Sequence, residues 1–122
     1  MMKVGIVLIN YKDYARRFLA DCRDSLRKTR YPADCFVVYI VDNASTEESR
    51  RYLHAEYPEA VVLSLQENSG WGGGNNIGMR RAFDDGCGGV VLLNMDTVVE
   101  SGWLEEIVKA AASAPNIGIV QS

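Results

Sequence analysis

The sequence lacks the long apolar run that a transmembrane helix requires. None of its hydrophobic segments approaches the ~20 residues of a membrane span, and the opening MMKVGIVLINYK lacks a cleavable signal pattern because charge returns at once. The residues are 48% hydrophobic and 24% charged, which is typical of one globular domain with its own core. We therefore expect residues 1–122 to form a single soluble, cytoplasmic domain.

Histidine, cysteine and positive charge are also scarce. His54 is the only histidine, which excludes any site that needs two. Cys22, Cys35 and Cys87 are odd in number and have no paired spacing for zinc or redox exchange, so we expect reduced, buried thiols. The net charge of -3 provides no basic face, and we therefore expect no nucleic-acid partner.

The chain does contain short apolar runs of strand length with helical patterns between them. The runs are rich in β-branched residues and nearly continuous, as expected of strands buried on both faces of a parallel sheet. They are VGIVLI (4–9), FVVYIV (36–41), VVLSL (61–65), GVVLL (89–93) and IGIV (117–120). Helices are expected over 13–30, 45–57, 75–84 and 101–113. This alternation predicts an α/β fold with a mainly parallel, doubly wound sheet and right-handed crossovers.

The first helical segment has a clear apolar period. Tyr14, Phe18, Cys22 and Leu26 recur at steps of four, with Leu19 beside them. This spacing predicts an amphipathic helix whose face with these side chains packs against the sheet.

The second helical segment begins with a capping signal. In STEE, residues 45–48, Ser45 can accept a hydrogen bond from the backbone amide of Glu48 while the Glu48 side chain reaches back. We therefore predict that Ser45 caps a helix that runs to about Tyr57, before Pro58.

Polar side chains follow four of the apolar runs at the point where each ends. They are Asn10 and Tyr11, then Asp42 and Asn43, then residues 66–68, and finally Asn94 and Asp96. Because ligands of parallel α/β sheets bind outside the carboxyl ends of the strands, these residues predict one site at that edge.

Three known phosphate-handling motifs fail on particular residues. The stretch NSGWGGGNNIG contains no GxGxxG and follows the third strand, which excludes a dinucleotide fingerprint. Gly73 and Gly78 have P-loop spacing, but Met79 and Arg80 stand where lysine and serine or threonine are needed. LLNMDTVV looks like the first motif of haloacid-dehalogenase-type phosphatases, yet Asn94 replaces the nucleophilic aspartate.

A nucleotide-sugar site remains consistent with these residues. Asp42 can accept hydrogen bonds from a nucleobase N–H or from ribose hydroxyls. Asp96 suits a hard divalent cation that keeps several waters and bridges phosphate oxygens. An amide-rich and glycine-rich loop lies between them in the sequence.

Four segments together resemble the family 2 glycosyltransferases. They are VLINYK, VYIVDNAST, ENSGWGGGNNIGMRRA and VVLLNMDTVV, and they follow the family's order across essentially the whole chain. The last two look like the rhamnosyltransferase-type branch, with LLNMDT as an asparagine-initiated variant of the DxD motif. The resemblance implies the Rossmann-like GT-A fold, with three α/β/α layers. It also implies sugar transfer from a nucleotide-diphosphate sugar to a glycan or lipid-linked acceptor, at the inner face of the membrane through peripheral association.

The resemblance also implies roles for individual residues. The backbone at Ile9, Asn10 and Tyr11 would border the base, and Asp42 would bind the base or ribose. A loop with Asn68, Gly70, Asn75, Asn76 and Gly78 would shape the nucleotide pocket, Asn94 would lie toward the ribose or a metal-bound water, and Asp96 would carry Mg²⁺ or Mn²⁺. The glycines from residue 70 would let the loop approach the nucleotide closely, and an exposed Trp71 there suggests stacking or a lid.

No general base is evident after Asp96. Glu100, Glu105 and Glu106 fall at or in a helix where solvated charges are expected, and family members normally continue with acceptor-binding segments. We therefore predict that residues 1–122 are the N-terminal part of a longer enzyme, incomplete for catalysis, with its base beyond residue 122. An unpaired last strand predicts a homodimer.

Two alternatives stay open. One is a nucleotide-binding or interaction module without catalysis on the same half-fold. The other is a nucleotidyltransferase, although such enzymes usually have a glycine-rich, basic loop after the first strand, which NYKDY lacks.

Overall fold

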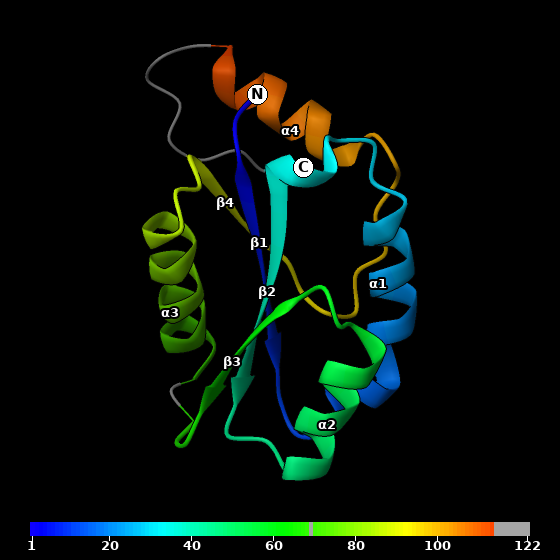
Figure 1. The fold of residues 1–122 in the computed structure, drawn as a ribbon, viewed down its shortest axis with the longest axis vertical. Helices are drawn as coiled ribbons and strands as arrows, with labels where there is room; N and C mark the ends of the chain where they lie inside the picture. Colours follow the sequence, from blue (N-terminus) through cyan, green and yellow to red (C-terminus); the bar gives the residue numbers. More distant parts are fainter. Residues whose placement is uncertain (69, 114–122) are drawn as a thin grey trace.

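The chain folds around one parallel sheet. The computed structural model describes residues 1–68 and 70–113, and in this part four strands pair in the order β3-β2-β1-β4 (Figure 1). They are β1 (Val4–Asn10), β2 (Phe36–Asn43), β3 (Val61–Leu65) and β4 (Gly89–Leu92), and every pairing is parallel. Four predicted strands are therefore confirmed to within two residues at their ends. The predicted fifth strand, 117–120, lies outside the described residues.

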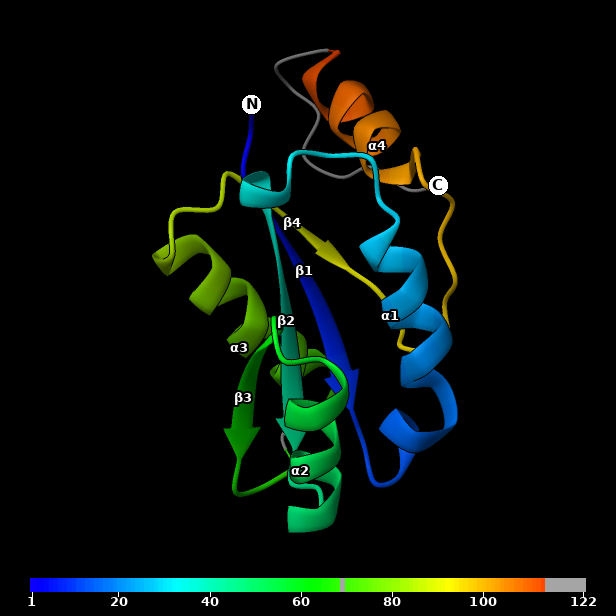
Figure 2. The same cartoon turned by 45° about the vertical axis from the view of Figure 1, so that its right-hand side comes forward.

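Helices cover both faces of this sheet. One face carries a single helix, α3 (Gly70–Asp84), and the other carries α1 (Ala20–Arg27), α2 (Glu47–Glu56) and α4 (Trp103–Ala112) (Figures 1 and 2). Short turns of π-helix, η1 (Ala15–Leu19), and 3-10 helix, η2 (Ala33–Cys35), complete the described elements. The predicted three-layer α/β/α architecture is confirmed. None of the helices in the described part has the length and hydropathy needed to cross a membrane.

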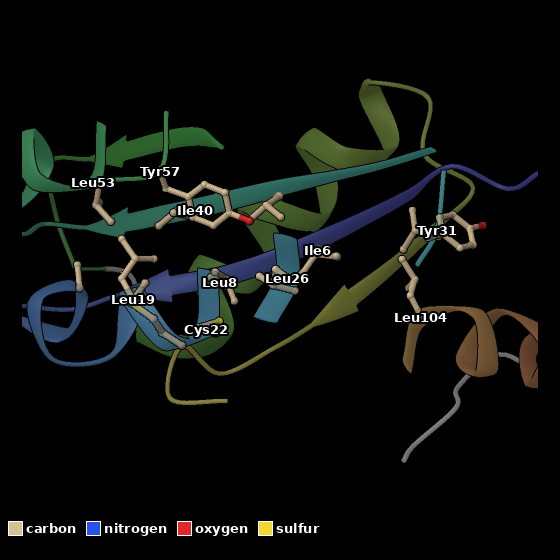
Figure 3. Close-up of a cluster of buried hydrophobic side chains, with 14 residues drawn as sticks. Ile6, Leu8, Leu19, Cys22, Leu26, Tyr31, Ile40, Leu53, Tyr57 and Leu104 are labelled. Carbon is tan, nitrogen blue, oxygen red and sulfur yellow. The ribbon is translucent and has the colours of Figure 1, made fainter. Parts of the chain in front are cut away.

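Alternation along the two central strands divides the core into two layers. Even-numbered side chains such as Ile6, Leu8 and Ile40 face α1, α2 and α4, where Figure 3 shows them packed against Leu19 and Leu26. Odd-numbered side chains of the same strands face α3 instead. They include Val7, Ile9, Tyr39 and Val41. This alternation matters for the site because it decides which polar residue at each strand end faces which helix.

Burial differs between the central and the edge strands. Every residue of β1 is buried, and so are most residues of β2, but β3 and β4 are mainly half-exposed. The prediction of strands buried on both faces therefore holds only for the central pair. Among the cysteines, Cys22 and Cys87 are buried free thiols as predicted, whereas Cys35 is only half-buried.

The apolar face of the first helix is shifted from the predicted one. Ala15, Leu19, Cys22 and Leu26 are the buried residues, while Tyr14 is 40% exposed. The cause is the helical period: Ala15, Leu19, Cys22 and Leu26 recur at steps of four, three and four, which keeps them on one face at 3.6 residues per turn, whereas repeated steps of four drift around the helix. The predicted stripe was wrong in its first half for this reason.

The predicted cap of the second helix was also wrong by one residue. Thr46, not Ser45, is the N-cap of α2, and its Oγ1 accepts a hydrogen bond from the amide of Ser49 at 3.1 Å. Ser45 instead donates its hydroxyl hydrogen to the Asp42 carboxylate. A buried carboxylate acceptor has displaced the local capping interaction.

The glycine-rich stretch forms a helix where a loop was predicted. α3 begins at Gly70 rather than near Asn75, so Asn75, Asn76 and Gly78 are helical residues. Gly78 lies against the sheet, because a Cβ built there would come within 2.5 Å of Val7 Cγ1. The glycines therefore let α3 approach β1 and β2 closely, which offsets their low helix propensity.

Candidate functional site

The strand order creates a switch point between β1 and β4. From β1 the chain moves outward through β2 to β3, with α1 and α2 on one face, and then returns through α3 on the opposite face to β4. β4 pairs with the free side of β1, in the register Val4 with Gly89. In open α/β sheets, ligands bind at such a point, outside the carboxyl ends of the strands.

A pocket of about 240 Å³ lies at this switch point. Its lining comes from four segments that are far apart in the sequence: the end of β1, the turn before η1, the first turn of α3 and the segment after β4. The lining residues are Ile9, Tyr11, Tyr14, Trp71, Leu93, Asn94, Met95 and Asp96. Of the predicted site residues, Ile9, Tyr11, Asn94 and Asp96 therefore share one pocket.

Asp96 is presented by a turn that the core anchors. The Leu93 amide donates to the Val7 carbonyl at 3.0 Å, which extends the ladder beyond β4, and the Thr97 amide donates to the Asn94 carbonyl at 3.1 Å. Met95 is 3% exposed within the core, whereas its neighbours Asn94 and Asp96 are exposed. Burial of Met95 therefore fixes a short turn whose two polar side chains are free to meet a ligand.

The donors present fit a cation that is bound partly by substrate. Among the described residues, no group of three or more His, Cys, Asp or Glu side chains is arranged to hold a metal, and Asp96 makes none of their salt bridges. Mg²⁺ commonly binds through one or two carboxylates and otherwise through waters and substrate phosphates. A single exposed carboxylate beside an amide meets that requirement only when a phosphate is also present.

The negative charge of Asp96 acts on the core behind the pocket. The pKa of the Cys22 thiol is raised to about 11, mainly by burial and secondly by the Asp96 carboxylate. Both effects disfavour the thiolate. Cys22 is therefore a protonated core residue at neutral pH, and no nucleophilic role follows for it.

Asp42 lies on the opposite face of the sheet from α3. It is completely buried, and its Oδ1 accepts from Asn10 Nδ2 at 2.9 Å and from the Ser45 hydroxyl. Its Oδ2 is buried without a hydrogen-bond partner in the described part of the chain. A direct contact between Asp42 and a nucleotide would have to use Oδ2, and the pocket lining does not include this residue.

Asn10 is engaged entirely within the protein. Its Nδ2 donates to Asp42 and to Ser49 Oγ, and its Oδ1 accepts from the Ala15 amide at 3.1 Å. The Asn10 side chain therefore joins β1, β2, η1 and α2, and only its backbone remains for the predicted contact with a base.

The predicted residues around α3 divide between its start and its buried face. Asn68 Oδ1 accepts from the Gly70 amide at 2.8 Å, and Asn43 Nδ2 donates to the Gly70 carbonyl at 3.2 Å, so both fix the beginning of the helix. Asn76 is exposed. Asn75 is 3% exposed, and its Nδ2 has no hydrogen-bond partner among the described residues.

Three pocket residues were missing from the predicted site. Leu93 was read only as the last residue of an apolar strand, and Met95 was given no role. Tyr14 was assigned to the core by steps of four, but the 3.6-residue helical period puts Ala15 on the buried face and leaves Tyr14 at the pocket. Trp71 was singled out in the sequence for stacking, and it is 54% exposed at the pocket.

Solved structures with similar folds include TarS and a mannosyltransferase. TarS from S. aureus, residues 1–349 with UDP, superposes with a TM-score of 0.74 at 20% identity. The mannosyltransferase PcManGT from Pyrobaculum calidifontis with GDP-Man and Mn2+ gives a TM-score of 0.76 at 23% identity. The match covers 99% of this chain and 39% of the TarS chain, and 96% of this chain and 34% of PcManGT. At these identities, the likeness shows a shared fold.

A family match identifies the chain more directly. No curated protein matches it. The model of the family described as "Glycosyl transferase family 2" matches residues 4–122, which includes every strand of the sheet and all residues of the pocket. The chain therefore belongs to glycosyl transferase family 2 and has the GT-A-like α/β fold of its structural neighbours.

Proposed function

We propose that this chain binds the diphosphate of a nucleotide-sugar donor in the switch-point pocket, for transfer of the sugar to a glycan or lipid-linked acceptor. The observation that carries the proposal is the exposed pair Asn94 and Asp96, held on a turn by the buried Met95. Family membership supports it. The similar folds of TarS, solved with UDP and with UDP-GlcNAc, and of PcManGT, solved with GDP-Man and Mn2+, support it further.

In the proposed reaction, an acceptor hydroxyl forms a bond to the anomeric carbon while the bond from that carbon to the diphosphate breaks. Negative charge grows on the departing diphosphate, and a bound Mg²⁺ or Mn²⁺ would offset it. Asp96 supplies the carboxylate for that ion. Because Met95 already fixes the turn, Asp96 and Asn94 need little rearrangement when the donor binds.

The single carboxylate predicts that the metal binds together with the nucleotide. Asn94 stands where a second aspartate would add negative charge, so the protein alone offers few ligands. Titration of Mn²⁺ into the nucleotide-free protein should therefore give little heat in calorimetry. Tight binding of the metal to the free protein would contradict this expectation.

The general base of this reaction would lie beyond residue 122. Among the described residues, Asp96 is the only carboxylate that lines the pocket, and Glu105 and Glu106 pair with Lys109 on α4. The chain spans about two fifths of the TarS structure. Residues 1–122 would accordingly form the donor-binding part of a longer glycosyltransferase.

Thermal denaturation tests the proposal with UDP, dTDP and GDP, each with and without Mn²⁺. Metal-dependent stabilisation by at least one of them, abolished by Asp96→Ala, is the expected result. Stabilisation by none of the three would overturn donor binding.

Sugar transfer by the full-length protein separates an enzyme from a non-catalytic nucleotide-binding module. A comparison of nucleotide-rhamnose, UDP-GlcNAc and GDP-mannose as donors tests the predicted rhamnosyltransferase-like branch. Preference for the rhamnose donor is expected, and preference for either of the others would contradict that branch.

A further inference from the structure

The two walls of the pocket differ in chemistry. One wall, from the segment after β4, carries the carboxylate of Asp96 and the amide of Asn94. The other carries three aromatic side chains, Tyr11, Tyr14 and Trp71, from the end of β1, the turn before η1 and the first turn of α3. A donor with a charged diphosphate and a planar base presents the same two kinds of surface.

The start of the first helical segment places Tyr14 in this aromatic wall. Ala15, Leu19 and Cys22 follow the 3.6-residue helical period and face the core, so Tyr14, one residue before Ala15, is left 40% exposed at the pocket. Tyr14 immediately precedes the π-turn η1, and such turns occur often at functional sites.

Neighbouring side chains hold the Tyr14 ring in position. Its centroid lies 6.1 Å from that of Tyr11 and 5.5 Å from that of Phe18, both in edge-to-face geometry. The guanidinium carbon of Arg17 lies 6.0 Å from the Tyr14 centroid and 4.9 Å from that of Phe18. Arg17 makes none of the salt bridges among the described residues, and its guanidinium lies against these two rings instead. Such contacts favour a fixed ring over a freely rotating one.

We infer that Tyr14 is a nucleobase-contacting residue that, with Tyr11 and Trp71, packs against the base of the donor. The inference rests on the proposed function, which assigns the diphosphate to the Asp96 wall and leaves the aromatic wall for the base. Aromatic side chains contact any base through its π-face, and this binding does not require a base-specific hydrogen bond.

Calorimetric titration of UDP and GDP, in the presence of Mn²⁺, tests this role. Tyr14→Ala should raise the dissociation constant of at least one nucleotide roughly five- to 100-fold, the range expected for loss of base–aromatic stacking. Tyr14→Phe keeps the ring and should bind like the wild type. Phe83→Ala is a matched control and should bind like the wild type, because Phe83 is an exposed aromatic side chain of α3 that does not line the pocket.

Inorganic pyrophosphate with Mn²⁺ separates this inference from the proposed function. Pyrophosphate should bind Tyr14→Ala as well as it binds the wild type. Equal loss of pyrophosphate and UDP affinity, or unchanged UDP and GDP affinity, would overturn the role of Tyr14 while donor binding stands. If Tyr14→Ala loses affinity for UDP-GlcNAc but not for UDP, the aromatic side chains contact the sugar, and this result would also overturn the role of Tyr14. Failure of the wild type to bind any nucleotide would overturn the proposed function itself.

Discussion

Replacement of Gly78 by alanine tests the close contact between α3 and the sheet. The added Cβ would lie 2.5 Å from Val7 Cγ1 and 3.2 Å from Val41 Cγ2, and both valines are completely buried. Overpacking of a core costs about 1–3 kcal/mol, whereas alanine returns about 1 kcal/mol through its better helix propensity. We therefore expect Gly78→Ala to lower the free energy of unfolding by up to about 2 kcal/mol.

Gly72→Ala is the matched control in the first turn of the same helix. A Cβ at Gly72 meets no atom within 4 Å, so only the gain in helix propensity applies. This variant should be more stable than the wild type by up to about 1 kcal/mol. Urea denaturation of both variants gives the comparison. The packing argument is refuted if Gly78→Ala is as stable as Gly72→Ala.

Two further predictions concern the cap of α2 and the pH dependence of stability. Thr46→Ala should lower the free energy of unfolding by about 1 kcal/mol, since the Ser49 amide loses its acceptor. Thr46→Ser should retain most of the wild-type stability. Equal stability of all three proteins in urea would exclude Thr46 as the cap. The pKa of the Cys22 thiol is raised in the folded state, so the folded state favours the protonated thiol. The resulting stabilisation of the folded state is complete below pH 9 and is lost as the pH rises from 9.0 to about 11. That loss amounts to about 3 kcal/mol, and Cys22→Ala should lack it; an unchanged slope of stability against pH in this variant would contradict the assignment.

The four described strands were predictable because short apolar runs rich in β-branched residues favour β-strands. Their burial was less predictable, since β3 and β4 lie at the edges of the described sheet and only β1 and β2 have a neighbouring strand on each side. An apolar run in the sequence indicates a strand. Whether that strand has one or two neighbouring strands depends on the order of the strands in the sheet, which the run itself does not indicate.

The start of α3 was not predictable from local preference. Four glycines among residues 70–74 favour a loop in isolation. In the folded chain, Asn68 and Asn43 bind the backbone of Gly70, and Gly74 and Gly78 lie close to Ile9 and Val7. These contacts between distant segments stabilise a helix that the local sequence disfavours.

The edge of the sheet that carries the site was predictable, but the face was not. Asp42 and Asn43 are adjacent, yet strand alternation directs Asp42 toward Asn10 and Ser45 and directs Asn43 toward Gly70 of α3. The side of each residue depends on the register between β1 and β2, in which Asn10 pairs with Asp42. Tyr14 was missed for a different reason: steps of four drift away from the 3.6-residue helical period, so Ala15 rather than Tyr14 continues the buried stripe.

Calorimetric titration of UDP and GDP, with and without Mn²⁺, into the wild type, Asp96→Asn and Glu100→Gln tests the central claim most directly. Glu100 is an exposed carboxylate in the same segment that does not line the pocket. The wild type and Glu100→Gln should bind at least one nucleotide about tenfold more tightly with Mn²⁺, the effect of one charge-assisted contact, and Asp96→Asn should lose this gain. A metal-dependent gain that survives in Asp96→Asn would contradict the assignment of Asp96 as the metal-binding residue of the donor site.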